Sequence, residues 1–197
     1  MIEKNSRRRP GRQGLRRTAR TLRNAIRMAT GQRFMAPYEA AYDVVHRVDF
    51  MRLRHYPEMI GVSQLDCEPI LLVPPLMVTA QVYDISPPLS AVQLLRNQGH
   101  DLWLCDFGIP ERERGGMRRT LDQHIVAISD TIDFIKESTG KDVHVAGYSQ
   151  GGLFVYLAVA YRGCKNVKSI ITFGSPVDFQ RNLPKDFDRE LTENILE

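Results

Sequence analysis

Short apolar runs alternate with longer amphipathic segments along most of this chain, and this alternation limits its fold more than any other feature. Strands are predicted at 50–57, 69–75, 101–108, 142–147 and 167–174. Helices are predicted at 37–48, 86–98, 121–139 and 150–162. Strands separated by helices of crossover length form parallel sheets with helices on both faces. The 197 residues are therefore predicted to hold one α/β domain.

Local signals indicate where the helices begin. The apolar spacing over 37–48 predicts a helix whose first turn carries a proline. Ser86 and Pro87 suit the N-cap and first residue of the next helix. Thr120 and Gln123 match the capping box, in which each side chain bonds the other residue's backbone N–H.

The composition is that of a globular protein, with 43% hydrophobic and 25% charged residues. The sequence lacks an apolar run long enough to span a membrane and the apolar core of a secretory signal. The spacing of Cys67, Cys105 and Cys164 fits neither a zinc site nor a disulfide framework. A cytoplasmic protein without a metal is predicted.

Residues 1–34 form a strongly basic arm, with eleven Lys and Arg residues against Glu3 alone. The remainder is mildly acidic. Apolar residues from Leu15 to Ala29 recur at helical spacing between the arginines. Such a helix suits a peripheral position on an anionic membrane or lipid inclusion, while a solvated tail or a transit peptide are the alternatives. No aromatic residue lies among the first arginines, so nucleic acid is not predicted as a partner.

The most informative motif is Gly147-Tyr148-Ser149-Gln150-Gly151, placed between a predicted strand and a predicted helix. This G-x-S-x-G pattern resembles the nucleophile elbow of α/β-hydrolases, whose strained turn exposes a catalytic serine. It has neither the lysine of a P-loop nor the spacing of a dinucleotide-binding loop. The alternative is a serine chosen only because a tight turn needs small residues. We therefore predict Ser149 as the nucleophile and Gly147 and Gly151 as elbow glycines.

An elbow nucleophile needs two N–H donors for the oxyanion that forms during acyl transfer. The N–H of Gln150, at the start of the following helix, is predicted as the first donor. The second should come from the loop after the 69–75 strand, where Pro74 and Pro75 have no N–H. Leu76 is the first residue after these prolines that has a backbone N–H, and we favour it over Met77 as the second donor.

A closer resemblance, over about 51–184, is to polyhydroxyalkanoate synthases of the two-subunit type. It is carried by "ILLVPPLMVTAQVYDI", "LCDFG", "VHVAGYSQGG" and "SPVDF". Those synthases use cysteine as the elbow nucleophile, whereas position 149 is serine. Serine favours hydrolysis of oxygen esters, so we expect a lipase or esterase, with acyl transfer from hydroxyacyl-CoA as the alternative. The resemblance also implies possible fusion to an acyl-CoA synthetase domain, and no cofactor.

The partners that Ser149 requires are missing from their expected places. In this fold the acid and the histidine follow the serine, but all five histidines precede it: His46, His55, His100, His124 and His144. Asp178, just after the next strand, is a candidate for the acid. We expect 35–197 to be the N-terminal portion of an incomplete α/β-hydrolase domain. The alternatives are a catalytically inactive relative that keeps the elbow for structural reasons, and a second chain that supplies the missing part. A further alternative for the function is a non-catalytic module that binds a lipid surface or a partner.

Overall fold

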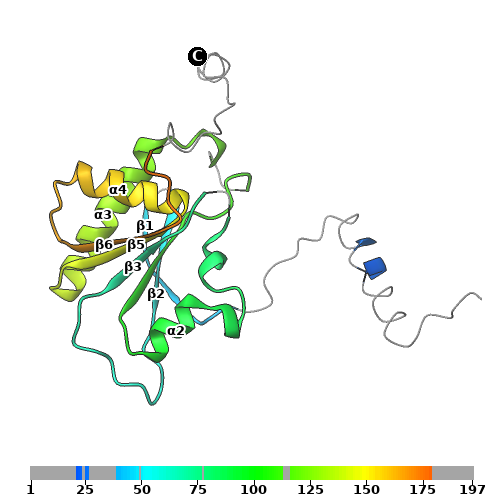
Figure 1. The fold of residues 1–197 in the computed structure, drawn as a ribbon, viewed down its shortest axis with the longest axis horizontal. Helices are drawn as coiled ribbons and strands as arrows, with labels where there is room; N and C mark the ends of the chain where they lie inside the picture. The colour runs from blue at the N-terminus through cyan, green and yellow to red at the C-terminus, as the bar shows by residue number, and fades with distance from the viewer. Residues whose placement is uncertain are drawn as a thin grey trace, which may run out of the picture. The chain divides into compact units, whose positions relative to one another are not determined.

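The computed structural model describes residues 21–23, 25–26, 39–48, 50–76, 78–112 and 116–178. Backbone contacts divide the chain into two units, Met1–Ala36 and Pro37–Glu197. In the first unit, the described residues are helical, with Leu22 and Ile26 more than half exposed. The rest of the helix expected over Leu15–Ala29 lies outside the described residues. The second unit contains a sheet with helices packed on it (Figure 1).

Within the described residues, six strands form one sheet in the order β1-β2-β4-β3-β5-β6. Strand β3 is parallel to β4 and β5, and β5 is parallel to β6. The β1–β2 and β2–β4 pairs are antiparallel. The parallel strands therefore end at one edge of the sheet. The strands are β1 (Asp43–Val48), β2 (Met51–Tyr56), β3 (Ile70–Val73), β4 (Leu102–Asp106), β5 (Val143–Tyr148) and β6 (Val167–Phe173).

The helix predicted over 37–48 is wrong. Residues 39–42 have no regular structure, and the segment from Asp43 forms β1. Its three valines are β-branched and suit a strand better than a helix. Antiparallel pairing with β2 provides the backbone hydrogen bonds. This partner, which spacing within the segment cannot reveal, decides the conformation.

The helices are α2 (Ala91–Asn97), α3 (Leu121–Thr139) and α4 (Gln150–Tyr161), with 3₁₀ turns η1 (Ala80–Tyr83), η2 (Pro87–Leu89) and η3 (Gly116–Arg118). The capping box of Thr120 and Gln123 is confirmed at the start of α3. Gly140, with φ of 72°, ends that helix in the left-handed conformation that glycine adopts most readily.

The predicted start at Ser86 is corrected by the structure. Ser86 precedes the 3₁₀ turn η2, and the N-cap of α2 is Ser90, whose hydroxyl accepts a hydrogen bond from Gln93 N–H at 2.9 Å. The prolines after Ser86 have no N–H for its side chain to cap. The first side-chain cap therefore forms only after both prolines.

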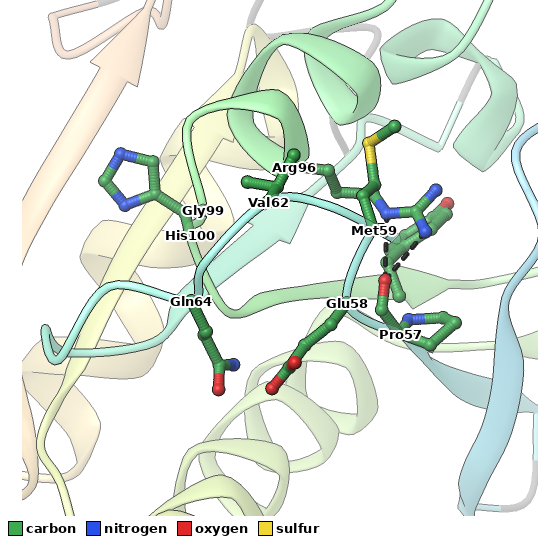
Figure 2. A pocket seen from close by; sticks show the side chains of 9 residues that line it. Pro57, Glu58, Met59, Val62, Gln64, Arg96, Gly99 and His100 are labelled. Carbon is green, nitrogen blue, oxygen red and sulfur yellow. Dashed lines mark hydrogen bonds between the residues drawn. The ribbon is translucent and has the colours of Figure 1, made fainter.

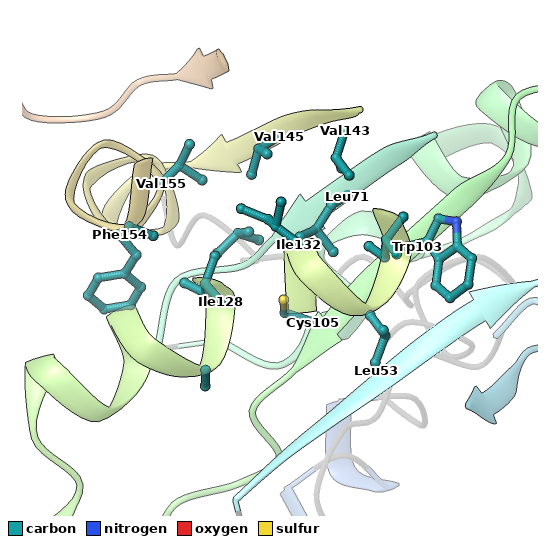
Figure 3. Packing of buried hydrophobic residues seen from close by; sticks show 14 of the residues in the cluster. Leu53, Leu71, Trp103, Cys105, Ile128, Ile132, Val143, Val145, Phe154 and Val155 are labelled. Atoms are coloured by element: carbon teal, nitrogen blue, oxygen red, sulfur yellow. The ribbon is translucent and has the colours of Figure 1, made fainter. Parts of the chain in front are cut away.

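Two apolar layers enclose the sheet, because alternate residues of a buried strand face opposite sides. On one side, Leu71, Val73, Val143 and Val145 pack with residues of α3 and α4, among them the fully buried Ile132. Figure 3 shows Leu71, Val143 and Val145 of the sheet beside Ile132 of α3. On the other side, the alternate strand residues pack against α2 and η1. Strands β3 and β5 therefore lie buried between the two layers.

Candidate active site

Ser149 lies at the sharp turn between β5 and α4, with φ of 53° and ψ of −122°. Non-glycine residues adopt positive φ rarely, and such strain costs about 1–3 kcal/mol. The Ser149 N–H donates to the carbonyl of Phe173 at 2.8 Å, which ties the turn to β6. The serine therefore sits at the carboxyl edge of the parallel strands, in the strand–turn–helix arrangement that an elbow requires.

Close packing requires the glycines around the serine. A Cβ on Gly151 would lie 2.2 Å from the carbonyl oxygen of Val73, and one on Gly147 would lie 2.5 Å from Cα of Gly152. Gly152 was not predicted as an elbow glycine, although it directly follows Gly151 in the sequence. A Cβ there would lie 1.8 Å from Oγ of Ser175, in the loop after β6. The turn is thus pressed between the ends of β3 and β6.

The two residues predicted as oxyanion donors are joined by a hydrogen bond between the backbone of Leu76 and the side chain of Gln150. Gln150 opens α4, where the first backbone N–H groups have no acceptor within the helix. The N–H of Leu76 donates to Oε1 of the Gln150 side chain at 3.1 Å. Leu76 is therefore near the elbow, but a side-chain oxygen occupies its N–H. Met77 lies outside the described residues.

No histidine is placed against Ser149 by the contacts within the described residues. Each histidine instead contacts another group. The ring of His46 stacks on Phe134. The other four form hydrogen bonds: His55 with Asp101, His100 with Cys67, His124 with the Thr120 carbonyl and His144 with Ser169. His124 is the most buried, and burial lowers its pKa. It lies among Phe50, Phe107 and Phe154. Aromatic packing, rather than acid–base work, explains this residue.

The acidic residues near the carboxyl edge divide into two kinds. Asp106, at the end of β4, is buried and accepts hydrogen bonds from Arg54 at 3.0 and 2.7 Å and from Gly108 N–H at 2.9 Å. These bonds give it a structural role. Asp178 is exposed in the loop after β6. Its assignment as the acid stays a prediction.

None of the three cysteines lies at the turn after β5, where position 149 is serine. Cys105 is fully buried in β4, and burial raises the pKa of its thiol. Cys67 lies in the loop before β3, and Cys164 lies exposed in the turn before β6. All three are free thiols away from the elbow. Any nucleophile at this turn is therefore an oxygen.

A small pocket lies at the opposite edge of the sheet, between the end of β2 and the start of β4 (Figure 2). Arg96 donates two hydrogen bonds to the Pro57 carbonyl, at 3.1 and 2.7 Å, across this pocket. Its volume is about 10 Å³, close to the space of one water molecule. The pocket is therefore too small for a substrate and distant from Ser149. It is lined by Tyr56, Pro57, Glu58, Met59, Val62, Gln64, Arg96, Gly99 and His100.

Among the described residues, no three His, Cys, Asp or Glu side chains gather in a way that would hold a metal ion. Within the same part of the chain, the helices are too short or too polar to cross a membrane.

The sheet order and the turn after β5 define the class of protein, and known structures agree. Mature lipase BlEst2 from Bacillus licheniformis superposes with a TM-score of 0.50 and 16% identity, over 66% of this chain and 49% of the lipase. A lipase-like protein from Sulfolobus solfataricus gives a TM-score of 0.51 and 17% identity, over 80% of this chain and 57% of that protein. The chain has an α/β-hydrolase fold.

The sequence relatives are more particular: they are poly(3-hydroxyalkanoate) polymerase subunits named PhaC. Those of Allochromatium vinosum and Thiocystis violacea are 30% and 31% identical over 161 residues, which is 81% of this chain. The subunit of Haloferax mediterranei is 35% identical over 112 residues, 56% of this chain and 22% of that subunit. The chain spans 42% of the length of the first two relatives. No family model matches it.

Proposed function

We propose that this protein is an acyl-ester enzyme in which Ser149 is the nucleophile. The observation that carries the proposal is the backbone of Ser149, held at positive φ between β5 and α4. The turn around it leaves no space for a side chain at Gly147 or Gly151. Such strain persists only where the surrounding structure enforces it, and it is concentrated at functional sites.

The chemistry follows from the atoms at the turn. Oγ of Ser149 would attack the ester carbonyl, and the oxyanion would form beside the N–H groups at the start of α4. Loss of the alcohol would leave an acyl-serine, which an acceptor then cleaves. Within the part of the chain that the structure describes, the contacts of Ser149 include neither the base that takes its proton nor the acid that orients that base. They remain to be supplied by residues beyond those described or by another chain.

Two acceptors for the acyl group distinguish the candidate functions. Water as acceptor gives a lipase or esterase, which the serine favours, because thiolates accept acyl groups from thioesters more readily. A hydroxyl at the end of a growing polyester gives a synthase, which the names of the sequence relatives favour. We favour hydrolysis, because the serine at the nucleophile position would itself take part in the reaction.

The products of the full-length natural protein separate these two functions. We expect free acid to be released from ester substrates, and Ser149→Ala to abolish this release. The measurement is titration of acid from a triacylglycerol or aryl ester, beside release of CoA from 3-hydroxybutyryl-CoA. Sustained polymer formation with negligible ester hydrolysis would establish the synthase instead.

Apolar side chains next to the elbow support a water-insoluble acyl substrate. Tyr148 and Phe173 are paired neighbours at the ends of β5 and β6, and Val177 lies in the loop beyond. They are 43%, 54% and 73% exposed. The same surface favours a third candidate, a non-catalytic module that binds a lipid surface or a protein partner. In that case Ser149→Ala would leave every activity of the natural protein unchanged.

The basic arm leads to a separate prediction about location. Deleting residues 1–34 should weaken binding to anionic vesicles and leave the sheet folded, because each arginine near such a surface contributes about 1 kcal/mol. Binding should also fall as salt screens these charges. Co-sedimentation with phosphatidylserine vesicles at low and high salt is the measurement. Equal co-sedimentation of the two chains at low salt would show that the arm is only a tail.

A further inference from the structure

The hydrogen bond between Leu76 and Gln150 joins the two residues that are predicted to serve the same oxyanion. The donor is the first N–H after Pro74 and Pro75, at the end of β3. The acceptor belongs to the residue that follows Ser149. The distance of 3.1 Å from Leu76 N to Gln150 Oε1 is that of an ordinary neutral hydrogen bond. An N–H aimed at this side chain is not available to a substrate oxygen.

We propose that the Gln150 side chain is a latch on the oxyanion hole. Its amide oxygen occupies the N–H of Leu76 in the free protein and leaves when a negatively charged oxygen forms on the substrate. The proposal rests on the proposed role of Ser149 as nucleophile. Gln150 would then serve twice, since its backbone N–H is one donor and its side chain controls access to the other.

The latch differs from a brace that holds Leu76 in place, and the packing favours the latch. The Leu76 side chain packs against the buried cluster of β3, β5, α3 and α4, so the core already positions its backbone. The end of β3 is fixed independently, because Tyr83 Oη donates to the Val73 carbonyl at 2.9 Å. That carbonyl lies directly against Gly151. Removing the Gln150 amide should therefore leave the Leu76 N–H where it is.

The Leu76 N–H can bond either the Gln150 oxygen or a substrate oxygen, and the relative strengths of these two hydrogen bonds make the latch selective for an oxyanion. A hydrogen bond to an ionised oxygen is roughly twice as strong as one between neutral groups. The Gln150 oxygen can therefore hold the N–H against water or a neutral ester carbonyl, and lose it to an oxyanion. Such a site binds the transition state more tightly than the ground state, which is the requirement for catalysis.

The test uses phenylboronic acid with the same full-length natural protein as the hydrolysis assay, so that the base for Ser149 is present. Oγ of Ser149 adds to boron, the hydroxyl proton goes to solvent, and the tetrahedral anion that forms mimics the reaction intermediate. Gln150→Ala should tighten binding by roughly two- to ten-fold, the equilibrium cost of breaking one neutral hydrogen bond. Gln150→Met, which keeps the length of the side chain without the amide oxygen, should give the same gain. Gln150→Glu should weaken binding, because its carboxylate holds the N–H more strongly and repels the anion.

Binding is measured by calorimetry and boron NMR above neutral pH, and circular dichroism checks that each variant is folded. The amide resonance of Leu76 should shift in Gln150→Ala and again on addition of the boronic acid. Unchanged binding by both Gln150→Ala and Gln150→Met would overturn the latch, and weaker binding by both would establish a brace instead. Equal boronate binding by Ser149→Ala and the unaltered chain would instead show that Ser149 is not the nucleophile, which refutes the proposed function itself.

Discussion

Residues 1–197 alone should hydrolyse p-nitrophenyl butyrate about 10⁴- to 10⁶-fold more slowly than an enzyme with a complete Ser-His-Asp triad. The reason is the position of the histidines. All five precede Ser149 in the sequence, and each contacts a group elsewhere in the fold. Without a base, the hydroxyl of Ser149 keeps its proton and attacks esters poorly.

The measurement is the initial rate of p-nitrophenol release, with Ser149→Ala as the matched control. Any residual rate should be small and nearly equal in the two proteins. Imidazole added to the solution should not restore a rate near that of a complete enzyme, because a free base lacks the orientation that a triad provides. Rapid turnover that Ser149→Ala abolishes would reveal a base that the described contacts do not show.

The second large effect concerns stability. Gly151→Ala should destabilise the fold by about 3 kcal/mol, at the upper end for added atoms in a packed site. The new Cβ would meet the Val73 carbonyl at 2.2 Å, and this atom is main chain, which no rotamer change can move. The bond from Tyr83 to the same carbonyl opposes its displacement. The melting temperature should fall by roughly 10 °C.

Gly140→Ala is the matched control for this prediction. Gly140 has φ of 72° at the end of α3, and a Cβ there would meet nothing within 4 Å. Its substitution should cost only about 1 kcal/mol, from left-handed strain. Thermal and urea unfolding of both variants provide the comparison. A loss in Gly151→Ala no larger than that in Gly140→Ala would mean that the end of β3 yields to the elbow.

Much of the fold could be predicted because its signals are local. Thr120 and Gln123 lie three residues apart and cap α3 through bonds between themselves and neighbouring backbone. The run from β5 through Ser149 to α4 likewise depends on adjacent residues, so the turn was predicted at the right position. The helix prediction for 37–48 failed because the conformation of this segment depends on a partner outside it rather than on signals within it. Its strand exists because β2 pairs with it, and this partner is not encoded in its spacing.

The sequence by itself determined which residue stands at the sharp turn, because a strand, a G-x-S-x-G motif and a helix follow one another without interruption. It also determined that the five histidines within residues 1–197 all precede that serine. Only the tertiary structure decided that the Gln150 side chain accepts a hydrogen bond from the Leu76 N–H. Leu76 and Gln150 are 74 positions apart and meet because parallel pairing of β3 and β5 brings the ends of both strands to one edge of the sheet. A hydrogen bond over that separation depends on the register of two strands, which no local pattern of residues specifies.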